Sequence, residues 1–244
     1  MKNLYKAALL AALGLGTIAS AQAQFTYSGT PQSGGGATYA SDLILGFTST
    51  SGNDTEFNLG TETSLVNGET WNLSSILTSY NLSTVDWGVV GTVTTGHLSY
   101  LTYNDAVNGD NLPVLTGVGA WNNINTANKT IYNNSFTSAA VDSAATIAAS
   151  SSASWNSETV NPTLGTQYQN ENVNPNLAGD GAIDFWVQNE GTGTDSVLGQ
   201  FSLASDGVVT FNVAAVPEPA TYGLLAGAGL LIVALRRQFS VKKA

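Results

Sequence analysis

The chain has 244 residues, no cysteine and a single histidine, and its formal net charge is −10. The lack of cysteine excludes disulfides, thiolate metal sites and cysteine nucleophiles, and one histidine excludes a multi-histidine metal centre. All 17 acidic residues lie between Asp42 and Glu218, against one basic residue there, Lys129, which gives this central part a formal charge of −16. Such a surface repels a phosphate backbone, so we expect no nucleic-acid partner.

The first 23 residues have the pattern of a signal peptide. Lys2 and Lys6 supply a positive start, residues 7–18 are apolar, and Ala21-Gln22-Ala23 is a small-x-small cleavage site. We predict cleavage after Ala23, which leaves Gln24 as the first residue of an exported chain. A retained N-terminal anchor is the alternative, and the short apolar run disfavours it.

Residues 24–215 are predicted to form one acidic domain. Residues 24–37 are polar and rich in glycine, so we expect them to be poorly fixed. A compact apolar run in residues 40–48 predicts a buried strand, and residues 56–60 alternate as a half-buried strand does. In residues 71–80 the apolar side chains follow helical spacing, which predicts a short helix with Asn72 as its cap.

The middle of the domain mixes strand and loop patterns. Residues 85–93 and 97–103 read as two strands, joined by a hairpin at Thr95-Gly96. The alanine- and serine-rich residues 136–152 are predicted to form one surface helix. Composition predicts three further segments, which are a turn-rich loop at 104–111, an edge strand at 113–118 and a long connection at 156–176.

The last part of the domain has the clearest strand pattern. Residues 183–187, 197–203 and 208–213 each predict a strand, and Asp206-Gly207 supplies the positive φ that a tight hairpin needs. Many short strands separated by Gly, Asn and Asp turns predict a mainly β, antiparallel sandwich or curled sheet with one or two short helices. No repeat of fixed period is present, so we do not expect a solenoid.

Two groups of residues could carry catalysis in this domain. Asp180 and Asp184 are candidates for the carboxylate pair that glycoside hydrolysis needs, but a turn aspartate and a solvent-facing strand residue are the simpler interpretation. His97 is the one imidazole base, but no Gly-x-Ser-x-Gly motif accompanies it, so we interpret it as a surface or edge residue.

Two groups could bind ligands. The side chains of Asp105, Asn108, Asp110 and Asn111 could offer oxygen ligands to calcium, but their spacing does not match a calcium-binding loop, and a solvated turn is the simpler interpretation. Tryptophans can stack on sugars, yet in a β domain they more often anchor the core. The five of this chain are Trp71, Trp87, Trp121, Trp155 and Trp186.

The C-terminal tail, residues 216–244, has the order of parts of a membrane-directed segment. Val216-Pro217-Glu218-Pro219 breaks regular structure, because each proline fixes φ and lacks a backbone donor. Residues 220–235 carry no charge and predict a transmembrane helix of roughly 24 Å, which is short for a bilayer core of about 30 Å. Arg236 and Arg237 follow as a basic stop that should stay cytoplasmic.

This tail resembles the PEP-CTERM sorting signal of exported bacterial proteins. The resemblance is carried by Pro217, Glu218 and Pro219, the short apolar segment and the Arg236-Arg237 pair. It implies recognition and processing near the motif by exosortase, a membrane protease-transpeptidase, while the precursor is held transiently in the inner membrane. The opening Asp42-Leu43-Ile44-Leu45-Gly46-Phe47, followed by Asn58-Leu59-Gly60, also looks like the start of many PEP-CTERM ectodomains.

We therefore expect a non-enzymatic, exported structural protein of the cell envelope or extracellular matrix, with no cofactor or metal. The resemblance implies association with exopolysaccharide or biofilm material. A carbohydrate-binding surface module is the first alternative and needs an exposed row of aromatic side chains. A secreted glycoside hydrolase is the second and needs two carboxylates facing one cleft.

Overall fold

The computed structural model describes residues 24–48, 52–103, 118–160 and 175–214. In chain order its elements are β1 (Gln24–Thr26), β2 (Leu43–Thr48), β3 (Asn53–Gly60), the 3-10 helix η1 (Glu62–Ser64), β4 (Glu69–Asn72), β5 (Asp86–Val93), β6 (Leu98–Tyr103), α3 (Val118–Ser135), β7 (Ala144–Ala148), the π-helix η2 (Asn156–Val160), β8 (Leu177–Ala178), β9 (Gly181–Asn189), β10 (Thr194–Leu203) and β11 (Val208–Val213).

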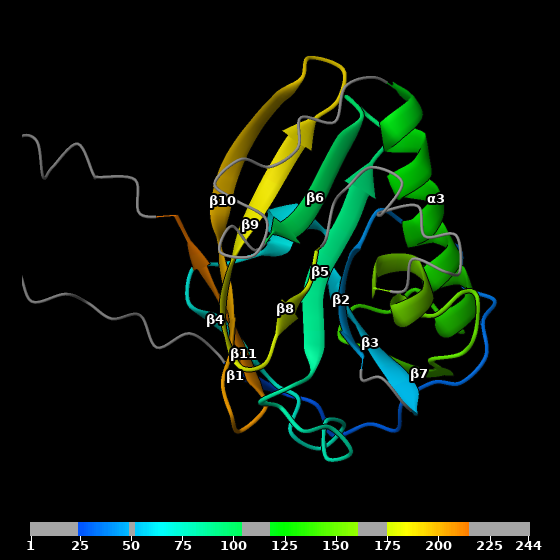
Figure 1. Ribbon diagram of the computed structural model, residues 1–244, viewed down its shortest axis with the longest axis vertical. Coiled ribbons are helices and arrows are strands. Elements are labelled where there is room, and N and C mark those ends of the chain that lie inside the picture. The colour runs from blue at the N-terminus through cyan, green and yellow to red at the C-terminus, as the bar shows by residue number, and fades with distance from the viewer. Residues whose placement is uncertain (1–23, 49–51, 104–117, 161–174, 215–244) are drawn as a thin grey trace, which may run out of the picture.

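Within the described residues, all eleven strands belong to one curled sheet (Figure 1). The strand order is β1-β4-β11-β10-β9-β6-β5-β2-β3-β7, and β8 pairs with β5 off this path. Every pair of neighbours is antiparallel except β1 and β4, which are parallel. A mainly β, curled sheet is thus confirmed, whereas a sandwich is wrong, because one continuous ladder joins the strands that two sheets would divide.

The larger core lies on the concave face of the sheet. Aromatic rings from three successive strands meet there: Phe201 packs against Phe185 and Phe211 at centroid distances of 5.1 and 4.9 Å. Trp71 of β4 and Trp87 of β5 are fully buried in the same cluster. Because aromatic side chains bury large apolar areas, their contacts account for the closure of the curl.

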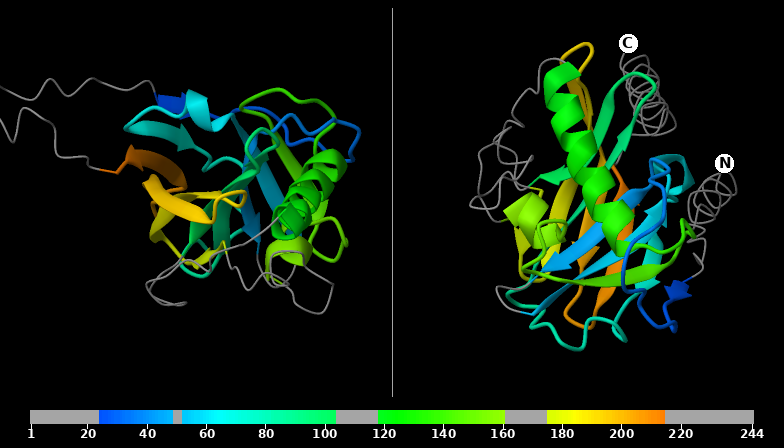
Figure 2. Two further views of the ribbon diagram at one scale, coloured as in Figure 1. Left: turned by 90° about the horizontal axis from the view of Figure 1, so that it is seen from above. Right: turned by 90° about the vertical axis from the view of Figure 1, so that its right-hand side faces the viewer.

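A second core lies on the opposite face, which α3 covers (Figure 2). Ala120, Ile124, Ala127 and Ile131 form a buried stripe on α3, and Ile44, Val90 and Leu101 of β2, β5 and β6 face it. Trp155, just before η2, joins this cluster and packs against Gly46. Four of the five tryptophans are buried and Trp186 is partly buried, as expected of core anchors.

Two predicted helices are wrong. Residues 71–80 form the end of β4 and a run of turns, in which Asn72 accepts hydrogen bonds from the backbone N–H and hydroxyl of Ser74. Leu73 and Leu77 are still buried, but the backbone N–H of Leu73 donates to Gly207 of the β10–β11 hairpin and not along a helix. Residues 144–148, inside the predicted helix 136–152, form β7 on the edge of β3.

Two further differences concern burial and order. β3 is buried on both faces apart from Asn53, and not half-buried, because the start of η2 and Tyr132 of α3 cover the face that would meet solvent. The glycine-rich residues 24–37 are fixed by backbone hydrogen bonds from Gly36 to Asn133 and from Ala37 to Phe136, both 2.9 Å long. Gly35 packs so tightly against Asn133 and Asn134 that a larger residue would not fit.

The contact between Gly46 and Trp155 leads to a first prediction. A Cβ atom at residue 46 would lie 1.9 Å from the indole ring, so Gly46→Ala must displace Trp155 or bend β2. We expect it to lower the free energy of unfolding by about 3 kcal/mol, measured by urea denaturation of the purified protein. Gly119→Ala on α3 is the matched control, because no atom lies within 4 Å of its added Cβ, and it should be neutral or stabilising by up to about 1 kcal/mol. Equal stability of the two variants would contradict this packing.

Candidate functional site at the exit of the C-terminal tail

The tail leaves the folded domain at the end of β11. The backbone N–H of Val213 donates to Oδ1 of Asn67 at 3.0 Å, and that of Ala214 donates to the carbonyl of Leu198 at 3.0 Å. Two residues before Val213, the carbonyl of Phe211 accepts a hydrogen bond of 2.8 Å from the backbone N–H of Gly68. The chain is therefore held on both sides of β11 through Ala214, three residues before Pro217.

The mature N-terminus predicted by the sequence lies at the same end of the sheet. β1 runs parallel to β4, with Gln24 opposite Thr70, and β11 runs antiparallel to β4, with Thr210 opposite the same residue. The start of β1 and the end of β11 consequently point toward the same end of β4. The two predicted membrane-directed segments would therefore leave from neighbouring strands, on either side of β4.

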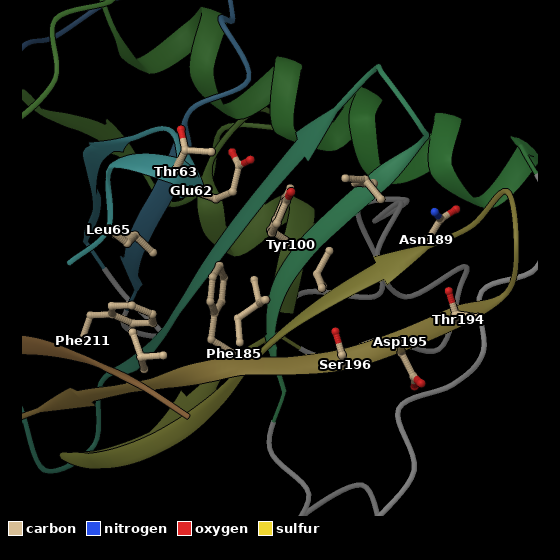
Figure 3. Close-up of a pocket in the computed structure, with 14 residues that line it drawn as sticks. Glu62, Thr63, Leu65, Tyr100, Phe185, Asn189, Thr194, Asp195, Ser196 and Phe211 are labelled. Carbon is tan, nitrogen blue, oxygen red and sulfur yellow. The ribbon is translucent and has the colours of Figure 1, made fainter. Parts of the chain in front are cut away.

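A groove of about 500 Å³ opens beside the end of β11, between η1 and strands β6, β9, β10 and β11 (Figure 3). Its floor is apolar and consists of core side chains, among them Tyr100, Phe185 and Phe211. Glu62 of η1 and Asp195 of β10 lie at its margin. Burial, together with the nearby charge of Glu62, raises the pKa of Tyr100, so its phenol stays neutral.

Exposed valines surround the exit. Four large hydrophobic side chains are exposed in the described part of the chain, and three of them, Val66, Val197 and Val213, are 49, 37 and 46 % exposed. Val66 precedes Asn67 and Val197 precedes Leu198, the two residues whose oxygens hold the end of β11. We call these three valines the exit collar. The fourth, Val141, follows α3, lies beside Gly60 at the end of β3 and does not line the groove.

One side of β10 is unpaired next to the collar. β11 pairs with β10 from Gly199 to Leu203, and Ala214 extends this pairing to Leu198. Residues 194–197 pair with β9 on one side, but no described strand pairs with the other. The groove and a free strand edge thus lie together where the tail departs.

The predicted carboxylate pair, Asp180 and Asp184, lines neither the groove nor a second depression together. Asp184 lies on β9, where its Oδ1 accepts a hydrogen bond of 3.1 Å from Gln200. Asp180 lies in the preceding turn and lines a different depression, of about 380 Å³, with Asp206. His97 lies in the turn between β5 and β6 with its ring against Trp121, at a centroid distance of 5.0 Å.

A buried carboxyl pair that the sequence did not single out lies between β3 and η2. Asp54 accepts hydrogen bonds from the hydroxyl of Thr48, at 2.5 Å, and from the N–H of Asn156, at 2.6 Å. Glu56 accepts one from the N–H of Trp155 at 3.3 Å. Both side chains are completely buried, which excludes direct contact with a substrate in this conformation. The alternation Asp54, Glu56, Asn58 was the available signal, since it places three polar side chains on one strand face.

Burial changes the ionisation of this pair. Desolvation raises the pKa of Asp54 to about 6, and the three hydrogen bonds to its carboxylate lower that pKa only in part. Desolvation, and next the charge of Asp54, raise the pKa of Glu56 well above its usual range. Lys129, the one basic residue in the central part of the chain, is exposed on α3 and does not share this buried position. The pair is therefore held mainly by neutral donors.

The remaining predicted sites lie outside the described residues. They are the leader cleavage site Ala21 and Ala23, the loop of Asp105 to Asn111, the motif Pro217, Glu218 and Pro219, the predicted transmembrane helix 220–235 and the basic stop Arg236 and Arg237. In the part that is described, no helix is long and apolar enough to span a bilayer. Nor do three or more potential metal ligands come together there.

Comparison with known families identifies the tail. The family model of the PEP-CTERM protein-sorting motif matches residues 215–238, which confirms the resemblance seen in the sequence. The match covers the tail alone, and neither a curated protein nor a solved structure matches the chain significantly. The motif marks an exported protein that passes through the membrane and is sorted by an exosortase.

The buried carboxyl pair predicts an unusual pH dependence of stability. Because the folded-state pKa of Asp54 lies above its unfolded value of about 4, the native state binds the proton more tightly, and the stabilisation is lost as pH rises through about 6. We expect the melting temperature to fall between pH 5 and pH 8, and Asp54→Asn to reduce this fall. Asp180→Asn, in an exposed turn, should keep the wild-type profile because the buried pair is intact. A melting temperature that rises over this range would contradict the assignment.

Proposed function

We propose that this exported protein is a non-enzymatic structural component of the cell envelope or extracellular matrix. The observation that carries the proposal is the sorting motif at residues 215–238, because such a signal addresses a whole domain to the outside. The acidic central part, with its formal charge of −16, supports a role in a hydrated matrix, where like charges keep it soluble. Its partner there would be exopolysaccharide, as the family resemblance implies.

The proposed path has two membrane steps. The leader directs export and is removed after Ala23, and the tail then holds the precursor in the inner membrane through residues 220–235, with Arg236 and Arg237 on the cytoplasmic side. An exosortase-type enzyme processes the chain near Pro217 and releases the domain. The neighbouring positions of β1 and β11 support this order, because both membrane-directed segments leave from one end of the sheet.

The two alternative functions receive less support. An exposed row of tryptophans would favour sugar binding, but the tryptophans of the described residues are buried or partly buried. Two carboxylates in one cleft would favour a hydrolase, but Asp180 and Asp184 do not line a common depression among those identified. We therefore retain the structural role as the proposal.

The sorting motif gives a direct test. With Pro217, Glu218 and Pro219 all changed to Ala, the precursor should keep its full tail and stay in the membrane fraction, because the feature that the enzyme recognises is gone. The wild type should lose the mass of the tail and leave that fraction. Intact-mass spectrometry after fractionation measures both, and Pro31→Ala, outside the tail, is the control. Normal processing of the triple variant would refute sorting through this motif.

The leader gives a second test. N-terminal sequencing of the exported protein should begin at Gln24, the first residue of β1. Ala23→Arg should block cleavage, because the peptidase requires a small residue there, and should leave a chain longer by the leader. A wild-type chain that still starts at Met1 would show that the N-terminal segment is not removed.

A further inference from the structure

The length of the connector limits how far the sorting motif can lie from the folded domain. Hydrogen bonds on both sides hold the chain through Ala214, and Pro217 follows three residues later. Three residues span at most about 11 Å when fully extended. This is about the diameter of one helix with its side chains, so an enzyme that grips residues 217–219 must touch the domain around the exit.

The surface at that point has the composition of an interface. The exit collar contains three of the four exposed large hydrophobic side chains in the described residues, and the apolar groove opens next to it. Single exposed valines are ordinary on a protein surface, but a group around one exit, beside an apolar groove, indicates a contact site. The unpaired edge at residues 194–197 adds backbone groups that could bond to an extended segment.

The charges around the exit restrict the kind of partner. Glu62 and Asp195 line the groove, and the carboxylate of Glu69 accepts a hydrogen bond from the N–H of Val66 at 3.0 Å. These carboxylates repel anionic lipid headgroups, which disfavours a membrane surface as the occupant. They complement a protein surface that is apolar at its centre and positively charged around it.

From this geometry we infer that the exit collar and the groove are a docking surface for the membrane enzyme that processes the tail. This inference rests on the proposed sorting function and extends it. The enzyme contacts the folded domain as well as the motif, through an apolar surface with positive charge. Recognition is therefore split between the tail and a site assembled by η1, β10 and β11.

The test compares valines at and away from the exit in cells that carry the processing enzyme. In the full-length precursor, Val66→Lys combined with Val213→Lys should slow tail removal at least tenfold, since it replaces apolar contacts by charges that repel the partner. Val141→Lys, at an equally exposed valine that does not line the groove, should be processed at the wild-type rate. Pulse-chase labelling with mass detection measures the rates, and leader removal confirms export of each variant.

A second pair of variants tests the charge without altering the collar. Asp195→Lys, on the exposed part of β10, should slow processing, and Asp180→Lys, in an exposed turn elsewhere, should not. The melting temperature of each variant verifies that its domain is folded. If the double valine variant is unstable, the comparison of Asp195→Lys with Asp180→Lys decides whether the exit is a docking surface. Eight Gly/Ser residues inserted after Ala214 should make processing insensitive to the collar, because the enzyme then reaches the motif without docking.

The outcomes separate this inference from the proposed function. Wild-type rates for the folded collar and Asp195 variants, together with a block in the Pro217/Glu218/Pro219 triple variant, would overturn the docking surface alone. Failure of the wild-type precursor to be processed would overturn both. Selective slowing of the exit variants relative to the Val141 and Asp180 controls would establish the docking surface.

Discussion

One continuous backbone ladder, bent on itself, is the constraint on which the rest of the structure depends. Because the ladder runs unbroken from β1 to β7, the concave face can enclose the aromatic core around Phe201 without a second sheet. The same arrangement places β1 and β11, from which the two ends of the chain leave, on either side of β4. Where the curl opens between η1 and β10, core side chains reach the surface and form the groove.

The other face of the ladder is more polar than an ordinary core. Oδ2 of Asp42 accepts hydrogen bonds from Asn58 at 2.9 Å and Tyr132 at 3.1 Å, and the backbone N–H groups before and within η2 bond to Asp54 and Glu56. Buried polar groups must find such partners, since leaving one unsatisfied costs about 1–3 kcal/mol. These bonds fix the positions of α3 and η2 in a way that apolar contacts, which are non-directional, would not.

The tail and the docking surface differ in how far the sequence reveals them. The sorting motif is contiguous, so Pro217, Glu218, Pro219 and the apolar segment could be recognised from order and spacing alone. The exit collar could not, because Val66 lies in a turn, and Val197 and Val213 lie in different strands, each unexceptional in its own segment. These positions come together only through the hydrogen bonds that Val213 and Ala214 donate to Asn67 and Leu198, which lie far away in the sequence or on another strand.

The sequence by itself determined the sorting motif of the tail, the acidic charge and the strands with compact or alternating apolar residues, because these are local properties. It also determined the β10–β11 turn, since Gly207 supplies the required positive φ of 84°. The tertiary structure decided the helix at α3, whose many asparagines weaken its intrinsic propensity, and the strand at β7, which forms because β3 offers an edge with free backbone groups. Residues 71–80 have helical spacing but are turned by bonds to Gly207, a distant residue. In β7 and at Leu73 the backbone found its hydrogen-bond partners far along the chain, and α3 buries its apolar stripe against distant strands. No local pattern records where those partners lie.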